Sequence, residues 1–259
     1  MASTSPTPTT TDTSDAPDRQ RSGNAVIRFG AVALPLGLIT AFAATAIHPH
    51  REDPMNDPAV FTEYAQNSDW IVVHFAQWAG SLLLFAGLLG VYYAIRPRSG
   101  PGSGPARLGL AATGQATAAI TALQVVDGVA LKWAVDAWAA APEGADKTAA
   151  FAAAQALRWT EYAFQSYSNI LLGLAVGLYG LAIARGTGYP RWLGYVAIGS
   201  AAAWITHGLL VAHIGLFDSI PRLIAQVLLV VSAAGIAPLM WRRSRPQSTT
   251  DRHEPVPTP

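Results

Sequence analysis

The chain has 259 residues, of which 51% are hydrophobic and only 13% are charged, and its mean hydropathy is +0.27. Because soluble domains carry about a quarter charged residues, this composition excludes an ordinary soluble enzyme and a wholly disordered chain. The chain contains no cysteine, which excludes disulfides, thiolate-bound zinc, cysteine-held iron–sulfur clusters and cysteine nucleophiles. Apolar stretches of about 20 residues predict an all-α, polytopic membrane protein.

Six apolar stretches follow one another between two polar tails. Residues 1–23 and 242–259 are expected to be disordered, because they contain few large apolar side chains. Residues 24–241 are expected to form one transmembrane domain. Two Ala-x-Ala sequences over residues 41–46 leave open the alternative that the first span is a cleaved leader. Five of the predicted spans cover residues 29–47, 70–95, 108–127, 193–217 and 223–241. The fourth span along the chain ends near Ala184 and is most apolar from Ile170.

The basic residues are distributed unevenly between the two sides of these spans. If the N-terminus is inside, the cytoplasmic segments hold 12 of the 17 basic residues, an excess that is typical of short cytoplasmic loops. We therefore expect both termini in the cytoplasm and a multi-pass protein of the cell (inner) membrane. The 12 residues are Arg19, Arg21, Arg28, Arg96, Arg98, Arg107, Arg185, Arg191, Arg242, Arg243, Arg245 and Arg252.

The third and fourth helices are predicted to be longer than a bilayer is thick. Nothing in residues 108–141 breaks a helix, and these 34 residues would span about 51 Å against a hydrocarbon core of about 30 Å. The fourth helix is expected to run from an N-cap at Asp146 to Ala184. Both should project from the outer face. Two spacings place opposite charges on one face of the projecting part: Lys132 with Asp136, and Arg158 with Glu161.

Helices 2 and 3 resemble helices 4 and 5, which suggests a possible parallel repeat. The residues over 108–121 match those over 193–206 at an offset of about 85–87 residues. In the same alignment His74 matches Glu161. Chance similarity between apolar helices remains an alternative.

Polar and ionisable side chains gather toward the outer side of the predicted bundle. Such groups are costly at membrane depth and usually face a bundle interior or a wet cavity. His74, Asp127 and Glu161 are the candidate catalytic residues, because imidazole and carboxyl groups perform acid–base chemistry. The alternative is that several polar residues only anchor helix ends. The residues expected to line an outward-opening polar cavity are Gln77, Trp78, Gln124, Gln165, His207 and His213.

The loop after the first span carries a His-x-His sequence followed by acidic residues. Imidazole and carboxylate groups bind zinc, copper or nickel, so His48 and His50 are candidate metal ligands. A haem held by His74 and either His207 or His213 is a further alternative. A lone histidine more often makes a hydrogen bond between helices, and we therefore expect no cofactor.

Several short motifs are spread along the chain. They are His48-Pro49, Asp69-Trp70 with His74, Leu88-Leu-Gly90, Arg107-Leu-Gly109, Val126-Asp-Gly128 and Tyr189-Pro-Arg-Trp-Leu-Gly194. In these motifs the chain resembles a group of small, uncharacterised, multi-pass integral membrane proteins of actinobacterial type, over about residues 28–240. The resemblance implies a multi-pass fold and carries no activity.

The polar side chains at the outer side favour an integral membrane protein that binds or transports a small molecule or an ion. One alternative is a membrane-embedded enzyme that acts on a lipid or isoprenoid substrate by His/carboxylate chemistry. A second alternative is a structural subunit, because the small-residue segments 109–114 and 173–177 permit close helix packing. The expected partners are the lipid bilayer, an unknown small molecule or lipid, and further copies or other subunits, but no nucleic acid.

Overall fold

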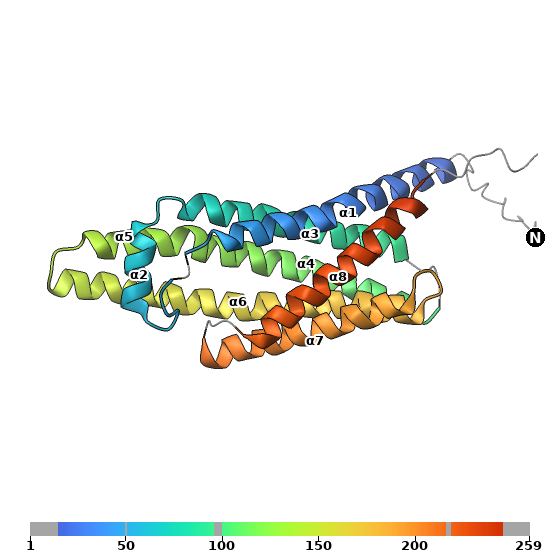
Figure 1. Cartoon of the computed structure of the whole chain (residues 1–259). Helices are drawn as coiled ribbons and strands as arrows, with labels where there is room; N and C mark the ends of the chain where they lie inside the picture. The colour runs from blue at the N-terminus through green and yellow to red at the C-terminus, as the bar shows by residue number, and fades with distance from the viewer. Residues whose placement is uncertain (1–14, 50, 96–99, 216–218, 246–259) are drawn as a thin grey trace, which may run out of the picture.

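The computed structural model describes residues 15–49, 51–95, 100–215 and 219–245. Over these residues the chain is helical, with short connections and no strand. Figure 1 shows an elongated bundle in which α1 begins and α8 ends at the same end. The elements are α1 (Asp15–Ala46), α2 (Asp57–Gln66), α3 (Trp70–Ile95), α4 (Ser103–Val125), the π-helical η1 (Val126–Leu131), α5 (Lys132–Ala140), α6 (Ala145–Arg185), α7 (Arg191–Ile214) and α8 (Ile220–Arg243).

Six helical segments among the described residues are long and apolar enough to cross a membrane. They are the predicted six spans, so the all-α six-helix bundle is confirmed. The end of the bundle at which α2 lies is called the α2 end from here on (Figure 1). The cytoplasmic position of the termini and the identity of the membrane remain expectations from the charge distribution.

The first span and the loop after it differ from the sequence prediction. Helix α1 begins at Asp15, inside the segment that the sequence predicts to be a tail. Hydropathy does not predict α2, because its 10 residues are too few for a span. This helix carries a short amphipathic pattern in which Val60, Phe61 and Tyr64 are buried. It therefore packs on the bundle rather than crossing the membrane.

The third and fourth spans outrun the bilayer, as predicted. Helix α6 has 41 residues, which corresponds to about 60 Å, twice the hydrocarbon thickness of about 30 Å. Helices α4, η1 and α5 continue one another over 38 residues. The predicted N-cap at Asp146 is wrong by two positions, because Gly144, at a φ of 122°, is the N-cap. Glycine adopts this backbone conformation without a steric penalty, and Asp146 lies in the first turn.

A second apolar core lies at the α2 end, separate from the core of the membrane bundle. It joins α2 to α5 and to the first turns of α6, the parts that extend past the other helices in Figure 1. This core covers the end of the bundle where the polar residues were expected. Its buried members are Val60, Phe61, Tyr64, Trp70, Leu131, Val135 and Ala154.

Glycines bring two helix pairs into close contact. A Cβ atom at Gly30 of α1 would lie 2.5 Å from the Cα atom of Gly90 in α3. Likewise, a Cβ atom at Gly180 of α6 would lie 2.8 Å from the carbonyl oxygen of Gly194 in α7. Both distances are too short for any side chain, so these backbones approach each other as small residues permit in membranes.

The two hairpins of the possible repeat pack differently. Helices α6 and α7 contact each other along much of their length, whereas α3 packs chiefly against α1 and much less against α4. The possible repeat therefore remains a prediction from the sequence.

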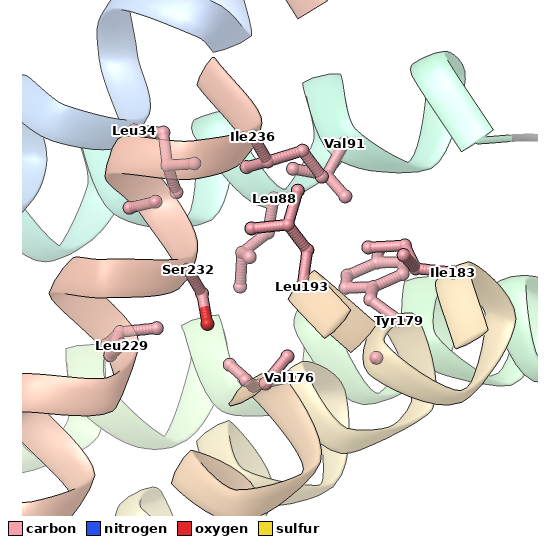
Figure 2. A pocket seen from close by; sticks show the side chains of 13 residues that line it. Leu34, Leu88, Val91, Val176, Tyr179, Ile183, Leu193, Leu229, Ser232 and Ile236 are labelled. Carbon is pink, nitrogen blue, oxygen red and sulfur yellow. The ribbon is translucent and has the colours of Figure 1, made fainter. Parts of the chain in front are cut away.

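An apolar cavity of about 40 Å³ lies in the membrane core. Figure 2 shows side chains of α3, α6, α7 and α8 around it, including Leu88, Val176, Leu193 and Ile236. The hydroxyl of Ser232, which reaches this space, donates to the carbonyl of Leu228 (2.9 Å). The proton of the Ser232 hydroxyl is therefore already used in a hydrogen bond within α8. None of the residues that line the cavity belongs to the polar cluster described below.

The glycine contacts predict a difference between two otherwise similar substitutions. Gly180→Ala should lower the thermal stability of the detergent-purified protein, because the added methyl group would collide with the α7 backbone. Gly114→Ala is the control, because nothing lies within 4 Å of a Cβ atom there, and alanine is favoured in helices by up to about 1 kcal/mol. Melting followed by tryptophan fluorescence should give a lower midpoint for Gly180→Ala alone. Equal midpoints would contradict the close approach of α6 and α7.

Candidate functional site

The centre of the polar cluster is a contact between α3 and η1. Nε2 of His74 lies 3.1 Å from Oδ2 of Asp127. The His74 side chain is 2% exposed and that of Asp127 is 13% exposed. The second carboxylate oxygen, Oδ1 of Asp127, is buried and has no hydrogen-bond partner within the described residues. Two of the three candidate catalytic residues, His74 and Asp127, therefore contact each other.

A π-helical turn directs Asp127 toward α3. Residues 126–131 form this turn between α4 and α5, and π-helical turns are frequent at functional sites. Gly128 allows α3 to come close, because a Cβ atom there would lie 2.7 Å from Cβ of His74. The indole N–H of Trp70 donates to the backbone carbonyl of Asp127 (3.1 Å). Backbone shape, glycine and indole thus fix the carboxylate against the imidazole.

The contacts of His74 show which of its ring nitrogens carries the proton. Nδ1 of His74 lies 2.7 Å from the carbonyl oxygen of Trp70, and a carbonyl can only accept, so Nδ1 carries the proton. In a neutral imidazole the other nitrogen, Nε2, then has a lone pair. Two acceptors, Nε2 and Oδ2 of Asp127, would face each other at 3.1 Å. A positively charged species, either a proton or a metal ion, is needed at this contact.

A second imidazole reaches the same place from the loop after α1. His48 is half-buried, and its ring centroid lies 4.9 Å from that of His74 and 5.0 Å from that of Trp70. Its Nδ1 donates to the carbonyl of Pro49 (2.7 Å). Burial lowers the pKa of His48, and the carboxylate of Asp127 opposes this shift. One ligand-type atom from each of His48, His74 and Asp127 lies within 4.8 Å of the other two.

A buried arginine organises the neighbouring part of the α2 end. Arg158 of α6 is 1% exposed, and its Nη1 donates to Oε2 of Glu161 (2.8 Å) and to the hydroxyl of Tyr64 (3.0 Å). Its Nε donates to the hydroxyl of Tyr162 (3.1 Å), which in turn donates to the carbonyl of Pro54 (3.1 Å). The predicted pairing of Arg158 with Glu161 is confirmed. These bonds tie α2 and the preceding loop to α6.

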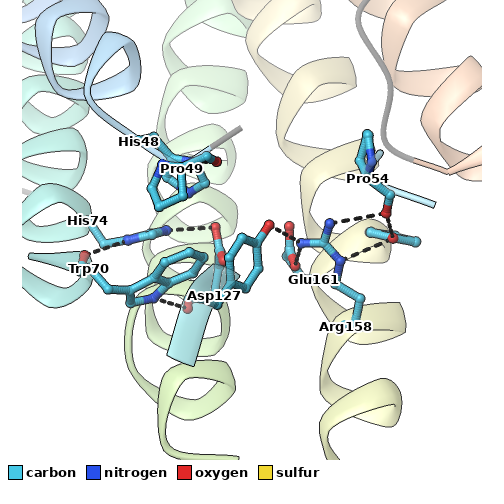
Figure 3. Close-up of polar contacts among 10 residues, drawn as sticks. His48, Pro49, Pro54, Trp70, His74, Asp127, Arg158 and Glu161 are labelled. Atoms are coloured by element: carbon cyan, nitrogen blue, oxygen red, sulfur yellow. Dashed lines mark hydrogen bonds and ion pairs between the residues drawn. The ribbon is translucent and has the colours of Figure 1, made fainter. Parts of the chain in front are cut away.

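Tyr64 and Trp70 join the two polar groups into one cluster. The two ring centroids are 4.0 Å apart, and that of Trp70 lies 4.4 Å from the ring of His74. Figure 3 shows Asp127 and Glu161 between the histidines on one side and Arg158 on the other. Burial raises the pKa of Tyr64 well above its usual value, so its hydroxyl stays neutral and can accept from Arg158. The cluster therefore runs from α1 across α3 and η1 to α6.

The other residues predicted to line a polar cavity have contacts outside this cluster. Among them, Nδ1 of His207 lies 2.9 Å from the hydroxyl oxygen of Ser219, and His213 is exposed. His50 lies outside the described residues, so the predicted His48–His50 metal pair stays a prediction. The amide groups and the indole have these partners: Gln77 donates to Thr45, Trp78 donates to Thr121, Gln165 donates to Asn169, and the buried Oε1 of Gln124 has none in the described part of the chain.

Sequence reasoning missed the contribution of Tyr64 and Trp70 to this site. Both are aromatic residues at the edge of a span, where such residues are commonly interpreted as a membrane-interface belt. The pairing of Trp70 with His74 four residues later was the available signal, because residues at this spacing share a helix face. No comparable signal in the sequence connects Tyr64 with Arg158, which is 94 positions away.

Comparison of the chain with known protein families, with curated proteins and with solved structures finds no match. The geometry of the cluster therefore carries the functional argument. It offers two imidazoles and a carboxylate as ligands, and a separate arginine–glutamate pair that is satisfied within the protein.

The buried ion pair predicts a strong asymmetry between single and double substitutions. Arg158→Met should destabilise the protein by about 3–5 kcal/mol, because it leaves the charge of Glu161 buried without a partner. Arg158→Met combined with Glu161→Met should recover most of this loss. Lys147→Met is the control, since it removes an exposed pair with Glu143 worth at most about 1 kcal/mol. Thermal and denaturant unfolding in detergent would measure all three variants.

Two results would contradict this interpretation. The first is a stability of Arg158→Met that equals that of Lys147→Met. The second is a double variant that is as unstable as the single variant, which would mean that the hydrogen bonds to Tyr64 and Tyr162, rather than the charge pair, hold the α2 end together.

Proposed function

We propose that this membrane protein binds a cation, either an inorganic ion or a small cationic molecule, at the His48–His74–Asp127 cluster of its α2 end. The observation that carries the proposal is the carboxylate of Asp127. It is almost enclosed by the bundle, one of its oxygens has no partner among the described residues, and the other faces an imidazole nitrogen that has a lone pair in the neutral state. A buried carboxylate in this setting favours a positively charged partner.

The charges within the cluster support the same proposal. Arg158 neutralises Glu161 through a direct ion pair. With neutral imidazoles, the carboxylate of Asp127 remains as one uncompensated negative charge. In the low dielectric of a protein interior such a charge attracts a cation far more strongly than it would in water.

The position of the cluster favours binding over passage through the bundle. Below the cluster, the interior between α1, α3, α6 and α8 is apolar, and side chains such as Leu34, Leu88, Val176 and Ile236 line its small cavity. The described side chains of this apolar core carry no charge that would compensate a cation on its way through the bundle. A receptor-like or sensor-like binding role is therefore better supported than transport.

One observation favours a second candidate, the membrane-embedded enzyme. With Nε2 protonated, His74 and Asp127 form a buried imidazole–carboxylate pair, and such groups serve in general acid–base catalysis. Glu161, the third proposed catalytic residue, is engaged by Arg158, so His74 and Asp127 would carry the chemistry. A lipid or isoprenoid substrate would fit the membrane setting of these residues.

Cation binding predicts a specific response to Asp127→Asn. Melting of the purified wild-type chain would be measured with ZnCl₂, MgCl₂, choline and spermidine. At least one cation should raise the midpoint by about 5–10 °C at 100 times its dissociation constant, which corresponds to about 2.7 kcal/mol. Asp127→Asn preserves the size of the side chain, removes the charge, and should abolish this shift.

Asp69→Asn is the matched control, because it removes an exposed carboxylate at the same end of the bundle. Its response to the cations should equal that of the wild type. A shift that persists in Asp127→Asn, or the absence of a shift with every cation, would contradict the proposed function.

A further inference from the structure

The three ligand-type side chains come from separate elements that converge on one point. His48 follows α1, His74 lies on α3 and Asp127 lies in η1, with their ligand atoms within 4.8 Å of one another. In a tetrahedral zinc site, with bonds of about 2.0–2.1 Å, neighbouring ligand atoms are about 3.3 Å apart. The 3.1 Å between His74 and Asp127 already fits one edge of such a site. His48 lies in a loop, so its imidazole can approach the other two ligand atoms without a shift of a helix.

The hydrogen bonds around the two histidines are those of metal ligands. A metal-bound imidazole usually donates its other N–H to a carbonyl or a carboxylate, which fixes the tautomer and the ring orientation. Here the Nδ1 atoms of both His48 and His74 donate to backbone carbonyls, those of Pro49 and Trp70, each at 2.7 Å. In both imidazoles Nε2 is the nitrogen that would coordinate a metal ion while Nδ1 keeps its proton.

The ligand types select the class of metal. Mg²⁺ and Ca²⁺ prefer sites made only of oxygen atoms, whereas imidazoles with a carboxylate suit zinc, cobalt, nickel and copper(II). The chain has no cysteine, so no thiolate competes for a softer ion. Three protein ligands leave one coordination position for water, as in zinc sites that exchange ligands. His48 is half-buried, so a metal ion can reach the site from the surface on its side.

We propose that His48, His74 and Asp127 bind one first-row divalent transition metal ion of the zinc type. This inference rests on the proposed function and names the chemical class of its cation. The metal ion supplies the positive charge required between Nε2 of His74 and Oδ2 of Asp127. It also links the loop after α1 to α3 and η1, so that a filled site joins three elements of the α2 end.

Metal binding to the full-length chain tests the inference. The protein would be purified in detergent with an affinity tag that contains no histidine, treated with a chelator, and titrated with Zn²⁺ and Co²⁺. One equivalent of each metal should bind, and Co²⁺ should show the visible absorption of a four- or five-coordinate site. His48→Ala, His74→Ala and Asp127→Asn should each weaken Zn²⁺ binding by about 100-fold or more, since even outer-shell changes cost about 10–100-fold.

Two control variants separate this site from other histidines. His213→Ala removes an exposed histidine of α7 and should bind Zn²⁺ as the wild type does. His50→Ala tests the His-x-His pair suggested by the sequence, and a loss as large as that of His48→Ala with no loss in His74→Ala would overturn the proposed ligand set. Circular dichroism and gel filtration establish that each variant is folded.

A measurement on the wild type alone covers the case in which His74→Ala does not fold. Electron paramagnetic resonance of the Cu²⁺-loaded protein resolves couplings to imidazole nitrogens, and two coordinated imidazoles are expected. One imidazole or none would overturn the inference.

The outcomes also separate the metal site from the proposed function. Failure to bind a stoichiometric metal, together with a choline or spermidine shift that requires Asp127, overturns the metal site and leaves cation binding supported. Failure of every cation overturns both. Stoichiometric metal that depends on His48, His74 and Asp127 supports both.

Discussion

The structure of the α2 end depends on a carboxylate that lies almost inside a membrane bundle. A charge in such a position is stabilised only by opposite charge or by strong hydrogen bonds. Asp127 is directed toward His74 by a π-helical turn, and the absence of a side chain at Gly128 lets the two helices approach. Trp70 uses its indole to fix the same turn. The helices are therefore arranged around this charge.

The second apolar core makes that arrangement possible. Because α5 and α6 extend past the other helices (Figure 1), α2 can pack on them and close the end of the bundle above Asp127. Arg158 fastens this closure through Tyr64 and through the loop before α2. The Arg158–Glu161 pair is satisfied and adds no net charge, so it does not compensate the carboxylate of Asp127.

The sequence predicts those features that local patterns control. Hydropathy places the six spans, helix length predicts the projection, and the i,i+3 spacing predicts the pairing of Arg158 with Glu161. Depth alone makes His74, Asp127 and Glu161 candidates for one site, and the contact between His74 and Asp127 comes from the structure. The π-helical turn and the position of His48 are beyond such patterns, because both depend on contacts between residues far apart in the chain. The sequence around Glu161 likewise does not distinguish a catalytic carboxylate from one that only pairs with Arg158, which is what the structure shows.

The donor side of His74 links cation binding to packing. A histidine that only connects two helices would donate its proton to the neighbouring helix, but His74 donates to Trp70 of its own helix. When the imidazole is neutral, its contact with η1 consists of a nitrogen lone pair and a carboxylate oxygen, which repel each other unless a proton or a metal ion lies at the contact. Because the site is shielded from water, both the repulsion and the attraction to a cation are strong. A proton or a cation at this contact would therefore also strengthen the packing of α3 against η1.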